Sequence, residues 1–253
     1  MRDIIPTIKI TNHAGVKSVK DGMKANSYSL IDREKKPNWI RMTAGQANKN
    51  YTLIKDRVTD LHLSTVCEEA KCPNLSECWS RGTATFMLMG DTCTRACQFC
   101  SVNTGNPNGW LDKDEPEKIA NTIALMNLKY IVLTCVNRDD IPDGGAQHFA
   151  NTVNAIKEKD RNIEVEVLTS DFNGSKEAVK TVIDSPIKVF AQNIETVERL
   201  THPIRDPRAG YSKTLKVLRF AKQMNPKIIT KTSIIVGLGE TDEEIYKTYK
   251  DLR

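Results

Sequence analysis

Six of the seven cysteines of this 253-residue chain lie within one short stretch, between Cys67 and Cys100. The last three have the spacing C-x3-C-x2-C in the segment CTRACQFC, and we call them the downstream triad: Cys93, Cys97 and Cys100. Three thiolates can hold three irons of a 4Fe–4S cluster and leave the fourth iron open for chemistry. Structural zinc usually takes four ligands in paired knuckles, and disulfides are disfavoured in a chain without a secretion signal. The spacing therefore predicts a catalytic 4Fe–4S cluster.

Three further cysteines, which we call the upstream triad, have the spacing C-x4-C-x5-C in the segment CEEAKCPNLSEC: Cys67, Cys72 and Cys78. Pro73 interrupts any helix through this segment, so the three thiols can converge instead of winding around a helix axis. Beside the downstream triad, this spacing predicts a second cluster that is again one protein ligand short. Cys135 stands apart at the end of a predicted strand, and we interpret it as a buried thiol that packs like a small apolar side chain.

A regular alternation of predicted strands and helices must position these thiols. The helices are indicated by apolar residues at helical spacing and the strands by short apolar, β-branched runs. A parallel return needs a crossover helix, so the alternation predicts a parallel sheet. In β/α barrels the active site is built from loops that follow the strands, and the downstream triad lies on such a loop. The predicted strands are 85–89, 130–134, 163–168, 187–190 and 228–236, and the predicted helices are 51–63, 115–126, 148–157, 176–183, 212–223 and 241–252.

The length of the chain limits the fold class. A complete (β/α)8 barrel needs about 250 residues, whereas about 170 residues follow Thr85. We therefore predict an α/β fold, a partial (β/α)6-type TIM-like barrel of parallel strands with its last strand missing, plus an N-terminal extension. Thr241 and Glu244 predict a capping box at the start of the last helix. The predicted divisions are a partly irregular N-terminal extension (1–66), an auxiliary cluster-binding segment (67–84) and a partial barrel that is incomplete at the C-terminus (85–253).

Basic charge is concentrated in the leading segment. Residues 1–66 carry 12 Lys and Arg against 6 Asp and Glu, whereas the remaining 187 residues carry 25 against 26. These basic residues are dispersed and do not form the dense runs of nucleic-acid-binding arms, so no nucleic-acid partner is predicted. Two interpretations stay open: a solvated, partly disordered extension, or a docking surface for an acidic protein. No apolar run approaches the roughly 20 residues that span a bilayer, and no signal-peptide core is present, which predicts a cytoplasmic protein without a membrane partner.

The motifs around both triads resemble one enzyme family. The C-x3-C-x2-C spacing, with Phe99 before the last cysteine, is similar to that of the radical S-adenosylmethionine superfamily. The segments CEEAKCPNLSECW, RDDIPDGGAQHF, QNIETVERL and IIVGLGET narrow the resemblance to the lipoyl synthase family, from about Lys36 to the C-terminus.

The resemblance implies two 4Fe–4S clusters per chain and S-adenosylmethionine as a further cofactor. The cluster on the downstream triad would chelate S-adenosylmethionine through its open iron and cleave it to a 5′-deoxyadenosyl radical. That radical would remove hydrogens from an octanoyl chain on a lysine of a lipoyl carrier protein, either a lipoyl domain or a protein of the glycine-cleavage H type. The cluster on the upstream triad would donate the two sulfur atoms. An electron donor such as ferredoxin or flavodoxin is implied as a second partner.

The same resemblance implies which side chains bind S-adenosylmethionine, and it assigns no side chain as a catalytic acid, base or nucleophile. Thr134 ends the second predicted strand, where the superfamily contacts the methionine moiety. Asn193 and Glu195 follow the fourth strand, where polar groups can reach the ribose or the amino acid. Gly237 and Gly239 follow the fifth, where the backbone can approach the adenine. The alternatives are an ordinary carboxylate at a helix start for Glu195 and an ordinary turn for the glycines.

The chain departs from the family pattern at several positions. Cys135 and Gln192 stand where the family usually has Ser and His, and the segment LTSDF (168–172) lacks a usual Pro. The family closes with an Arg-Ser-Ser motif whose serine is the fourth ligand of the sulfur-donating cluster, and no such motif precedes Arg253. The expectation is therefore a chain that binds both clusters and is incomplete for catalysis.

Some alternatives stay open at this point. Another radical S-adenosylmethionine enzyme, such as a biotin-synthase-like sulfurtransferase or a methylthiotransferase, would share the downstream triad. A non-catalytic iron–sulfur or zinc-binding module would use the same cysteines structurally. The charged loop 138–140 either shapes a substrate tunnel or is simply solvated.

Overall fold

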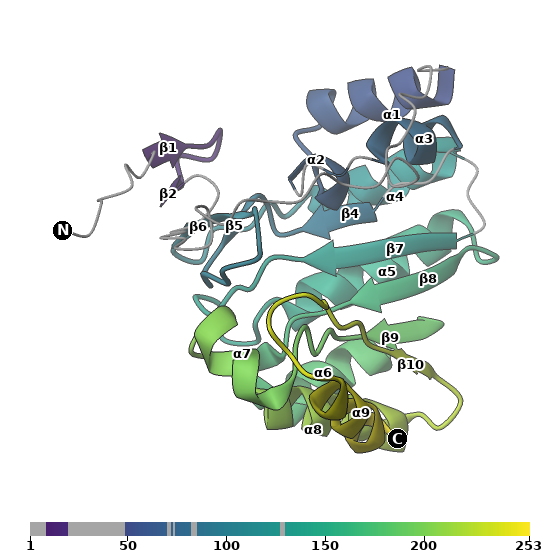
Figure 1. The fold of residues 1–253 in the computed structure, drawn as a ribbon. Helices are drawn as coiled ribbons and strands as arrows, with labels where there is room; N and C mark the ends of the chain where they lie inside the picture. The colour runs from purple at the N-terminus through teal and green to yellow at the C-terminus, as the bar shows by residue number, and fades with distance from the viewer. Residues whose placement is uncertain (1–8, 20–48, 70–71, 73, 82–84, 127–129) are drawn as a thin grey trace.

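The structure, a computed structural model, describes residues 9–19, 49–69, 72, 74–81, 85–126 and 130–253. A six-stranded sheet forms the centre of the molecule (Figure 1). Five of its strands pair in parallel and follow one another in chain order across the sheet. The sixth, β3, pairs antiparallel with β4 at one edge. In spatial order the strands are β10 (Ile229–Lys231), β9 (Val189–Ala191), β8 (Glu164–Leu168), β7 (Tyr130–Cys135), β4 (Thr85–Leu88) and β3 (Ser64–Thr65).

Helices connect the parallel strands and pack side by side in the same order, α4 against α5, α5 against α6 and α6 against α8. Because each parallel return is made by a helix, this arrangement is the partial β/α barrel that the alternation predicts, and the fold class is confirmed. The predicted helix 176–183 has the same bounds as α6. The connecting helices are α4 (Glu115–Met126), α5 (Ala146–Lys159), α6 (Lys176–Ile183), α7 (Glu198–Ile204) and α8 (Tyr211–Met224), and α9 (Asp242–Leu252) follows β10.

Apolar residues of the strands and helices form one continuous core. Phe86, Leu133 and Phe190, from three parallel strands, are completely buried. Val165 and Val167 of β8 are completely buried as well, as expected for parallel strands covered on both faces. The last helix begins at the predicted capping box, in which the Thr241 hydroxyl accepts the Glu244 N–H and the Glu244 carboxylate accepts the Thr241 N–H. Within the described part of the chain, no helix is both long and apolar enough to cross a bilayer.

A second, four-stranded sheet connects the N-terminal segment to the downstream triad. Its strands lie in the order β1 (Lys9–Thr11), β2 (Lys17–Val19), β6 (Asn103–Gly105) and β5 (Thr92–Cys93). The sequence predicts a partly irregular N-terminal extension, loosely structured over residues 1–36, but residues 9–19 form a hairpin. Two contacts across the chain explain this difference: β2 pairs with β6, and the Asn12 side chain donates to Asp91 over 2.8 Å. The other residues of 1–36 lie outside the described residues.

Two regions differ from their predicted elements because tertiary contacts replace local preference. Strand β10 ends at Lys231, whereas the apolar run predicts a strand to residue 236. Beyond Lys231, the Thr232 hydroxyl accepts the Ile194 N–H and the Ser233 carbonyl accepts the Glu195 N–H, which leaves only a single bridge at Ile234. The described residues before β4 include three helices, of which only the first is predicted: α1 (Lys49–Asp60), α2 (Val66–Glu69) and α3 (Leu75–Ser80).

Candidate cofactor site at the carboxyl ends of the parallel strands

The downstream triad lies on residues 93–100, an irregular loop that starts from the last residue of β5 and that we call the cluster loop. Three of its backbone N–H groups donate to two other segments of the chain. The Thr94 N–H donates to the Asn137 carbonyl over 2.9 Å, and the Gln98 N–H donates to the Ile204 carbonyl over 2.8 Å. The Ala96 N–H donates to the Asp206 carboxylate over 3.0 Å. The shape of the cluster loop is therefore imposed by the segments that follow β7 and α7.

Backbone N–H groups point at two of the three sulfurs. The Cys93 sulfur accepts the N–H groups of Arg95 and Asn137, at 3.4 and 3.3 Å, and the Cys97 sulfur accepts the Asp206 N–H at 3.3 Å. Burial raises the pKa of Cys93 to about 11, although these two N–H bonds oppose the rise, and the neighbouring thiols of the triad raise it further. N–H donors favour the thiolate, which is the form that binds iron. The three thiols are thus close enough to interact, and their surroundings suit an iron–sulfur cluster.

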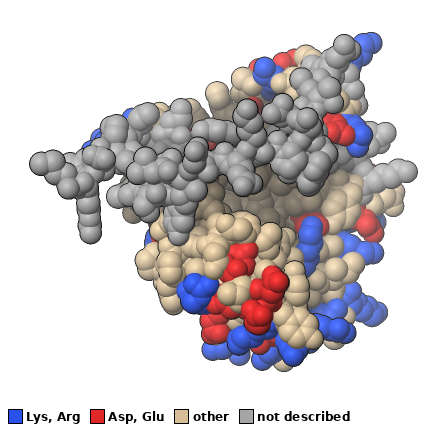
Figure 2. Space-filling model, viewed as in Figure 1, with Lys and Arg blue, Asp and Glu red and all other residues tan. Residues whose placement is uncertain are grey.

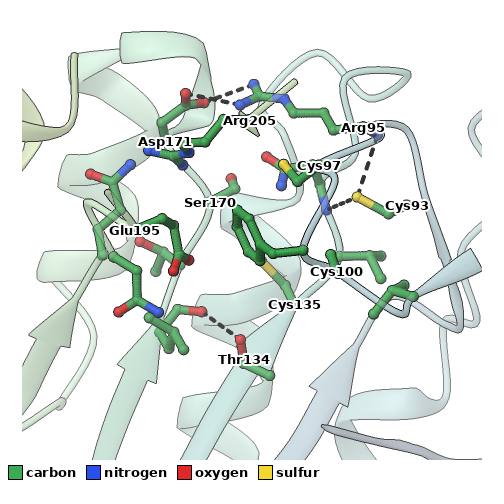
Figure 3. Close-up of a pocket in the computed structure, with 18 residues that line it drawn as sticks. Cys93, Arg95, Cys97, Cys100, Thr134, Cys135, Ser170, Asp171, Glu195 and Arg205 are labelled. Atoms are coloured by element: carbon green, nitrogen blue, oxygen red, sulfur yellow. Dashed lines mark hydrogen bonds and ion pairs between the residues drawn. The ribbon is translucent and has the colours of Figure 1, made fainter. Parts of the chain in front are cut away.

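A cavity of about 170 Å³, which we call the cofactor cavity, lies beside the cluster loop. Figure 3 shows the three cysteines on one side of this cavity and Glu195 on the other. The cavity lies at the carboxyl ends of β7, β8 and β9, where sheets of this kind bind their ligands. The structure therefore brings the downstream triad together with three of the five residues predicted to bind S-adenosylmethionine: Thr134, Asn193 and Glu195.

Two residues of the cavity wall have buried polar atoms without partners. The side-chain oxygen of Gln192 and the Nε of Arg205 are buried and have no hydrogen-bond partner among the described residues, although both residues line the cavity. Buried polar atoms in native proteins are nearly always paired, so orphaned atoms at a cavity indicate a polar ligand. S-adenosylmethionine carries an ammonium, a carboxylate and hydroxyl groups, and these complement an amide oxygen and a guanidinium. The residues present therefore fit this cofactor.

Glu195 occupies an unusual position in the cavity wall. Its backbone has a φ of +65°, a left-handed conformation that non-glycine residues adopt rarely and that is often found at functional sites. Burial raises the pKa of the Glu195 carboxyl, while Arg205 and Asn193 oppose the rise. A half-buried carboxylate of this kind is suited to a cationic ligand, because a cation would favour its charged form.

Cys135 and Thr134 end strand β7 at the same cavity. The Thr134 hydroxyl donates to the Leu168 carbonyl over 3.0 Å, which orients its oxygen. Cys135 packs against the core, as predicted, and in addition it lines the cavity. Burial raises the pKa of Cys135 to about 12, against the effect of a Ser170 N–H, so the side chain is a neutral thiol.

Gly237 and Gly239 lie apart from the cofactor cavity, in an exposed turn between β10 and α9. Their φ angles of +92° and +101° explain why glycine is present, since other residues adopt this conformation at a cost. Glu240 accepts the N–H groups of Gly237 and Leu238 and closes the turn. Their contact with an adenine stays a prediction.

The upstream triad is also brought together. Cys67 lies in α2 and Cys78 in α3, and Cys72 lies between them with its N–H donating to the Cys67 carbonyl over 3.0 Å. Burial raises the pKa of Cys78, and the two other thiols raise it further, so all three are close enough to interact. Pro73 lies outside the described residues. Among the side chains that are described, no three His, Cys, Asp or Glu residues are placed to share a single metal ion, whereas each iron of a cluster needs only one thiolate.

Several charged residues around the cluster loop were not predicted from the sequence. Arg95 lies inside the CTRACQFC segment and Asp171 inside LTSDF, so both charged residues belong to motifs that the sequence already singled out. Asp206 and Arg208 come from a segment without a predicted role. Arg138 has 1% of its surface exposed. The interpretation of residues 138–140 as a solvated loop is therefore wrong for Arg138. Together with Asp139 and Asp140, Arg138 lines a second cavity, of about 300 Å³.

Comparisons with known proteins agree with this geometry. Residues 87–252 match the radical SAM superfamily, and residues 9–72 match the N-terminal domain of lipoyl synthase of that family. Lipoyl synthase from Legionella pneumophila strain Corby is 58% identical over 97% of this chain and 74% of its own length. Lipoyl synthase from Francisella philomiragia is 59% identical over the same shares.

A solved structure, that of methylornithine synthase, has a TM-score of 0.52 at 14% identity and covers 82% of this chain and 57% of its own, so it supports the fold alone. The sequence matches confirm the predicted superfamily, the predicted sulfurtransferase activity and the predicted S-adenosylmethionine and 4Fe–4S cofactors. The chain belongs to the lipoyl synthase family of radical S-adenosylmethionine enzymes.

Proposed function

We propose that the downstream triad holds a 4Fe–4S cluster, that the cofactor cavity binds S-adenosylmethionine beside it, and that the upstream triad holds a second cluster that donates sulfur. The observation that carries this proposal is that three thiols line one cavity together with Gln192 and Arg205, whose side chains have buried, unpartnered polar atoms. When bound there, these groups supply one-electron chemistry that removes hydrogen atoms from unreactive carbons, and sulfur that takes their place.

The side chains of the cavity have distinct roles in this proposal. The Glu195 carboxylate faces the cationic part of S-adenosylmethionine, and the Arg205 guanidinium donates to its carboxylate. The Gln192 oxygen accepts from an ammonium or a hydroxyl, and Thr134 and Asn193 orient the remaining polar atoms. Apolar lining residues exclude water, which would otherwise react with a radical, and these are Phe99, Val102, Val136 and Leu168.

The predicted division of the chain is part of the same proposal. Residues 67–84 form the segment that holds the second cluster, residues 85–253 form the partial barrel, and residues 1–66 form the N-terminal extension. We place the adenine of S-adenosylmethionine near the turn that contains Gly237 and Gly239, because that turn follows the fifth parallel strand.

Iron content tests the two-cluster proposal. After anaerobic reconstitution with iron and sulfide, the wild-type chain is expected to bind about eight irons. A variant with Ala at all three downstream cysteines is expected to lose about half of that iron, and so is a variant with Ala at all three upstream cysteines. Wild-type loading of only about four irons would overturn the proposal of two clusters.

Cofactor affinity tests the role of Glu195. We expect Glu195→Gln to weaken binding of S-adenosylmethionine to the reconstituted chain about 10- to 100-fold, because a charge-assisted contact is lost. Anaerobic calorimetry measures this affinity without relying on turnover. Glu198→Gln is the matched control, since Glu198 is exposed on α7 and pairs with Lys247. Equal affinity in both variants and in the wild type would exclude Glu195 from the site.

Three partner and location proposals accompany this function. The substrate is an octanoylated lipoyl carrier protein, either a lipoyl domain or a protein of the H type, and it docks through the basic N-terminal segment. A ferredoxin- or flavodoxin-type protein supplies the electrons. The location is the cytoplasm, because all seven cysteines are free thiols and two triads must stay reduced in order to bind iron.

A further inference from the structure

A network of charged side chains, three of them buried, surrounds the cluster loop and has no part in the function proposed above. Arg95 lies in the loop between Cys93 and Cys97, and its side chain is 3% exposed. One edge of its guanidinium donates to Asp171, with distances of 2.8 and 2.9 Å. The other edge donates to Asp139, with distances of 2.8 and 3.0 Å. Figure 3 shows Arg95 and Asp171 together at the upper rim of the cofactor cavity.

A second arginine completes the network on the other side of the loop. Arg208 donates to the Asp206 carboxylate at 2.8 and 3.0 Å and to the Thr94 carbonyl at 2.5 Å. Asp206 in turn accepts the Ala96 N–H, and its own N–H donates to the Cys97 sulfur. Arg208 also lies 3.3 Å from Asp139, which joins the two halves. We call this set the loop clamp: Arg95, Asp139, Asp171, Asp206 and Arg208.

The loop clamp acts through geometry more than through charge. Its two arginines and Lys213, which lies 3.8 Å from Asp171, balance its three carboxylates, so the network adds no net charge beside the cluster. Arg95 nevertheless makes two paired contacts to carboxylates that follow different strands, β7 and β8. A planar guanidinium can make both pairs at once, whereas a lysine ammonium is a point charge and cannot.

We propose that Arg95 is a positioning residue that holds the cluster loop in the conformation in which its three thiolates bind one cluster. The proposal rests on the proposed function, in which the downstream triad is the ligand set. The loop has no helix or strand of its own beyond Cys93, so its shape depends on these bonds. Groups that orient metal ligands from behind commonly change metal affinity about 10- to 100-fold when they are removed.

Cluster release tests this proposal in two cysteine backgrounds of the full chain. In the first, the upstream cysteines are Ala, so only the downstream cluster forms, and in the second the downstream cysteines are Ala. We expect Arg95→Lys to speed loss of iron to a ferrous chelator about 10- to 100-fold in the first background and to leave the second unchanged. Visible absorbance follows the release, and turnover is not needed.

A matched substitution and a second variant exclude a general effect on folding. Arg199 makes a similar fork to Glu244, at 2.7 and 2.9 Å, far along the chain from the cluster loop, so Arg199→Lys should leave release unchanged in both backgrounds. If Arg95→Lys fails to fold, Asp139→Asn provides the test instead. It keeps the shape of the side chain and removes the charge of one of the two carboxylates that pair with Arg95. Asp139→Asn is expected to speed release from the downstream cluster alone.

The outcomes separate the two proposals. Unchanged release from the downstream cluster in Arg95→Lys and in Asp139→Asn would overturn the clamp. Equal acceleration in both cysteine backgrounds would also overturn it, because that result would mean a general loss of stability. If the first background binds no iron at all, the ligand assignment of the downstream triad is wrong, and the failure belongs to the proposed function.

Discussion

The Arg138 guanidinium is completely buried, and its partners explain how the loop after β7 tolerates it. It donates to Asp140 twice, at 2.8 Å each, and to the carbonyls of Trp110 and Met89, at 2.7 and 3.3 Å. Burial alone would raise the pKa of the Asp140 carboxyl, but Arg138 and the Gly109 N–H hold it below its ordinary value. Asp140 is therefore a carboxylate in the folded state, and its pairing stabilises the loop.

Asp140→Asn is expected to lower the free energy of unfolding by about 3 kcal/mol near neutral pH, because it leaves a buried cation short of its counter-charge. A folded-state pKa below the unfolded value contributes stability above about pH 4, and that stability is lost as the pH falls through the folded pKa. The gap between the wild type and the variant should therefore shrink below about pH 4. Urea denaturation of the apo chain across this range measures it.

Asp56→Asn is the control for this experiment, because Asp56 is an exposed residue of α1. Its effect on unfolding should be small at every pH. A gap between wild type and Asp140→Asn that stays constant down to pH 3 would show that the ion pair is not the cause.

At the scale of elements, the smaller sheet links the N-terminal hairpin to the downstream triad. Strand β2 pairs with β6, and β6 pairs with β5, which contains Cys93. The contact between β2 and β6 is very close at Gly105, where an added Cβ would lie 2.5 Å from the Lys17 carbonyl oxygen. The hairpin therefore depends on glycine at this position.

Gly105→Ala is expected to detach the hairpin, because backbone atoms of β2 cannot give way as a flexible side chain could. The pairing of β2 with β6 is expected to become less stable by about 1–3 kcal/mol. Limited trypsin digestion should then cleave after Lys17 faster than in the wild type. Gly210→Ala is the control, since its Cβ would meet the Lys213 Cβ at 3.4 Å and the Lys213 backbone nitrogen at 3.9 Å, which leaves room for it. Equal cleavage rates in both variants would contradict the proposed tight pairing.

At the scale of the whole molecule, the charges on α9 and on the N-terminal hairpin bear on how a charged partner approaches. Figure 2 shows acidic side chains gathered over the region of α9, whose first turn contains Asp242, Glu243 and Glu244. An acidic carrier protein would be repelled from that face. The hairpin presents exposed Lys9 and Lys17 beside the sheet that contains Cys93, and these residues belong to the basic leading segment.

Replacing Lys9 and Lys17 by Glu together is expected to lower the association rate with an acidic lipoyl carrier about tenfold at low ionic strength and to flatten its salt dependence. Stopped-flow or surface-binding kinetics at several salt concentrations measure both effects. The double variant of Lys216 and Lys227 to Glu makes the same charge change at exposed positions in α8 and the loop after it. An equal drop in association rate in that control would mean that the net charge of the chain, and not the hairpin, governs docking.

Much of the fold was predictable because its signals are local. Strands such as β8 are short apolar runs between helices with apolar faces, and α6 and α9 begin directly after Ser175 and Thr241, whose side chains cap the helix. The hairpin of residues 9–19 was not predictable. Its strands are three residues each, and their stability comes from β6, which lies more than eighty residues away in the chain.

The sequence by itself determined the class of chemistry. The spacing of the six cysteines predicts iron–sulfur clusters, and the motifs around them indicate the family, without any knowledge of the folded structure. It also placed Thr134, Asn193 and Glu195 at the ends of strands, and parallel strands bring such ends to one edge. Only the tertiary structure decided that Gln192 and Arg205, each with an unpartnered buried atom, line the same cavity, and that Arg95 joins carboxylates from two strand ends. The physical reason is that pairing of buried charges depends on distances across the fold, which residue spacing does not encode.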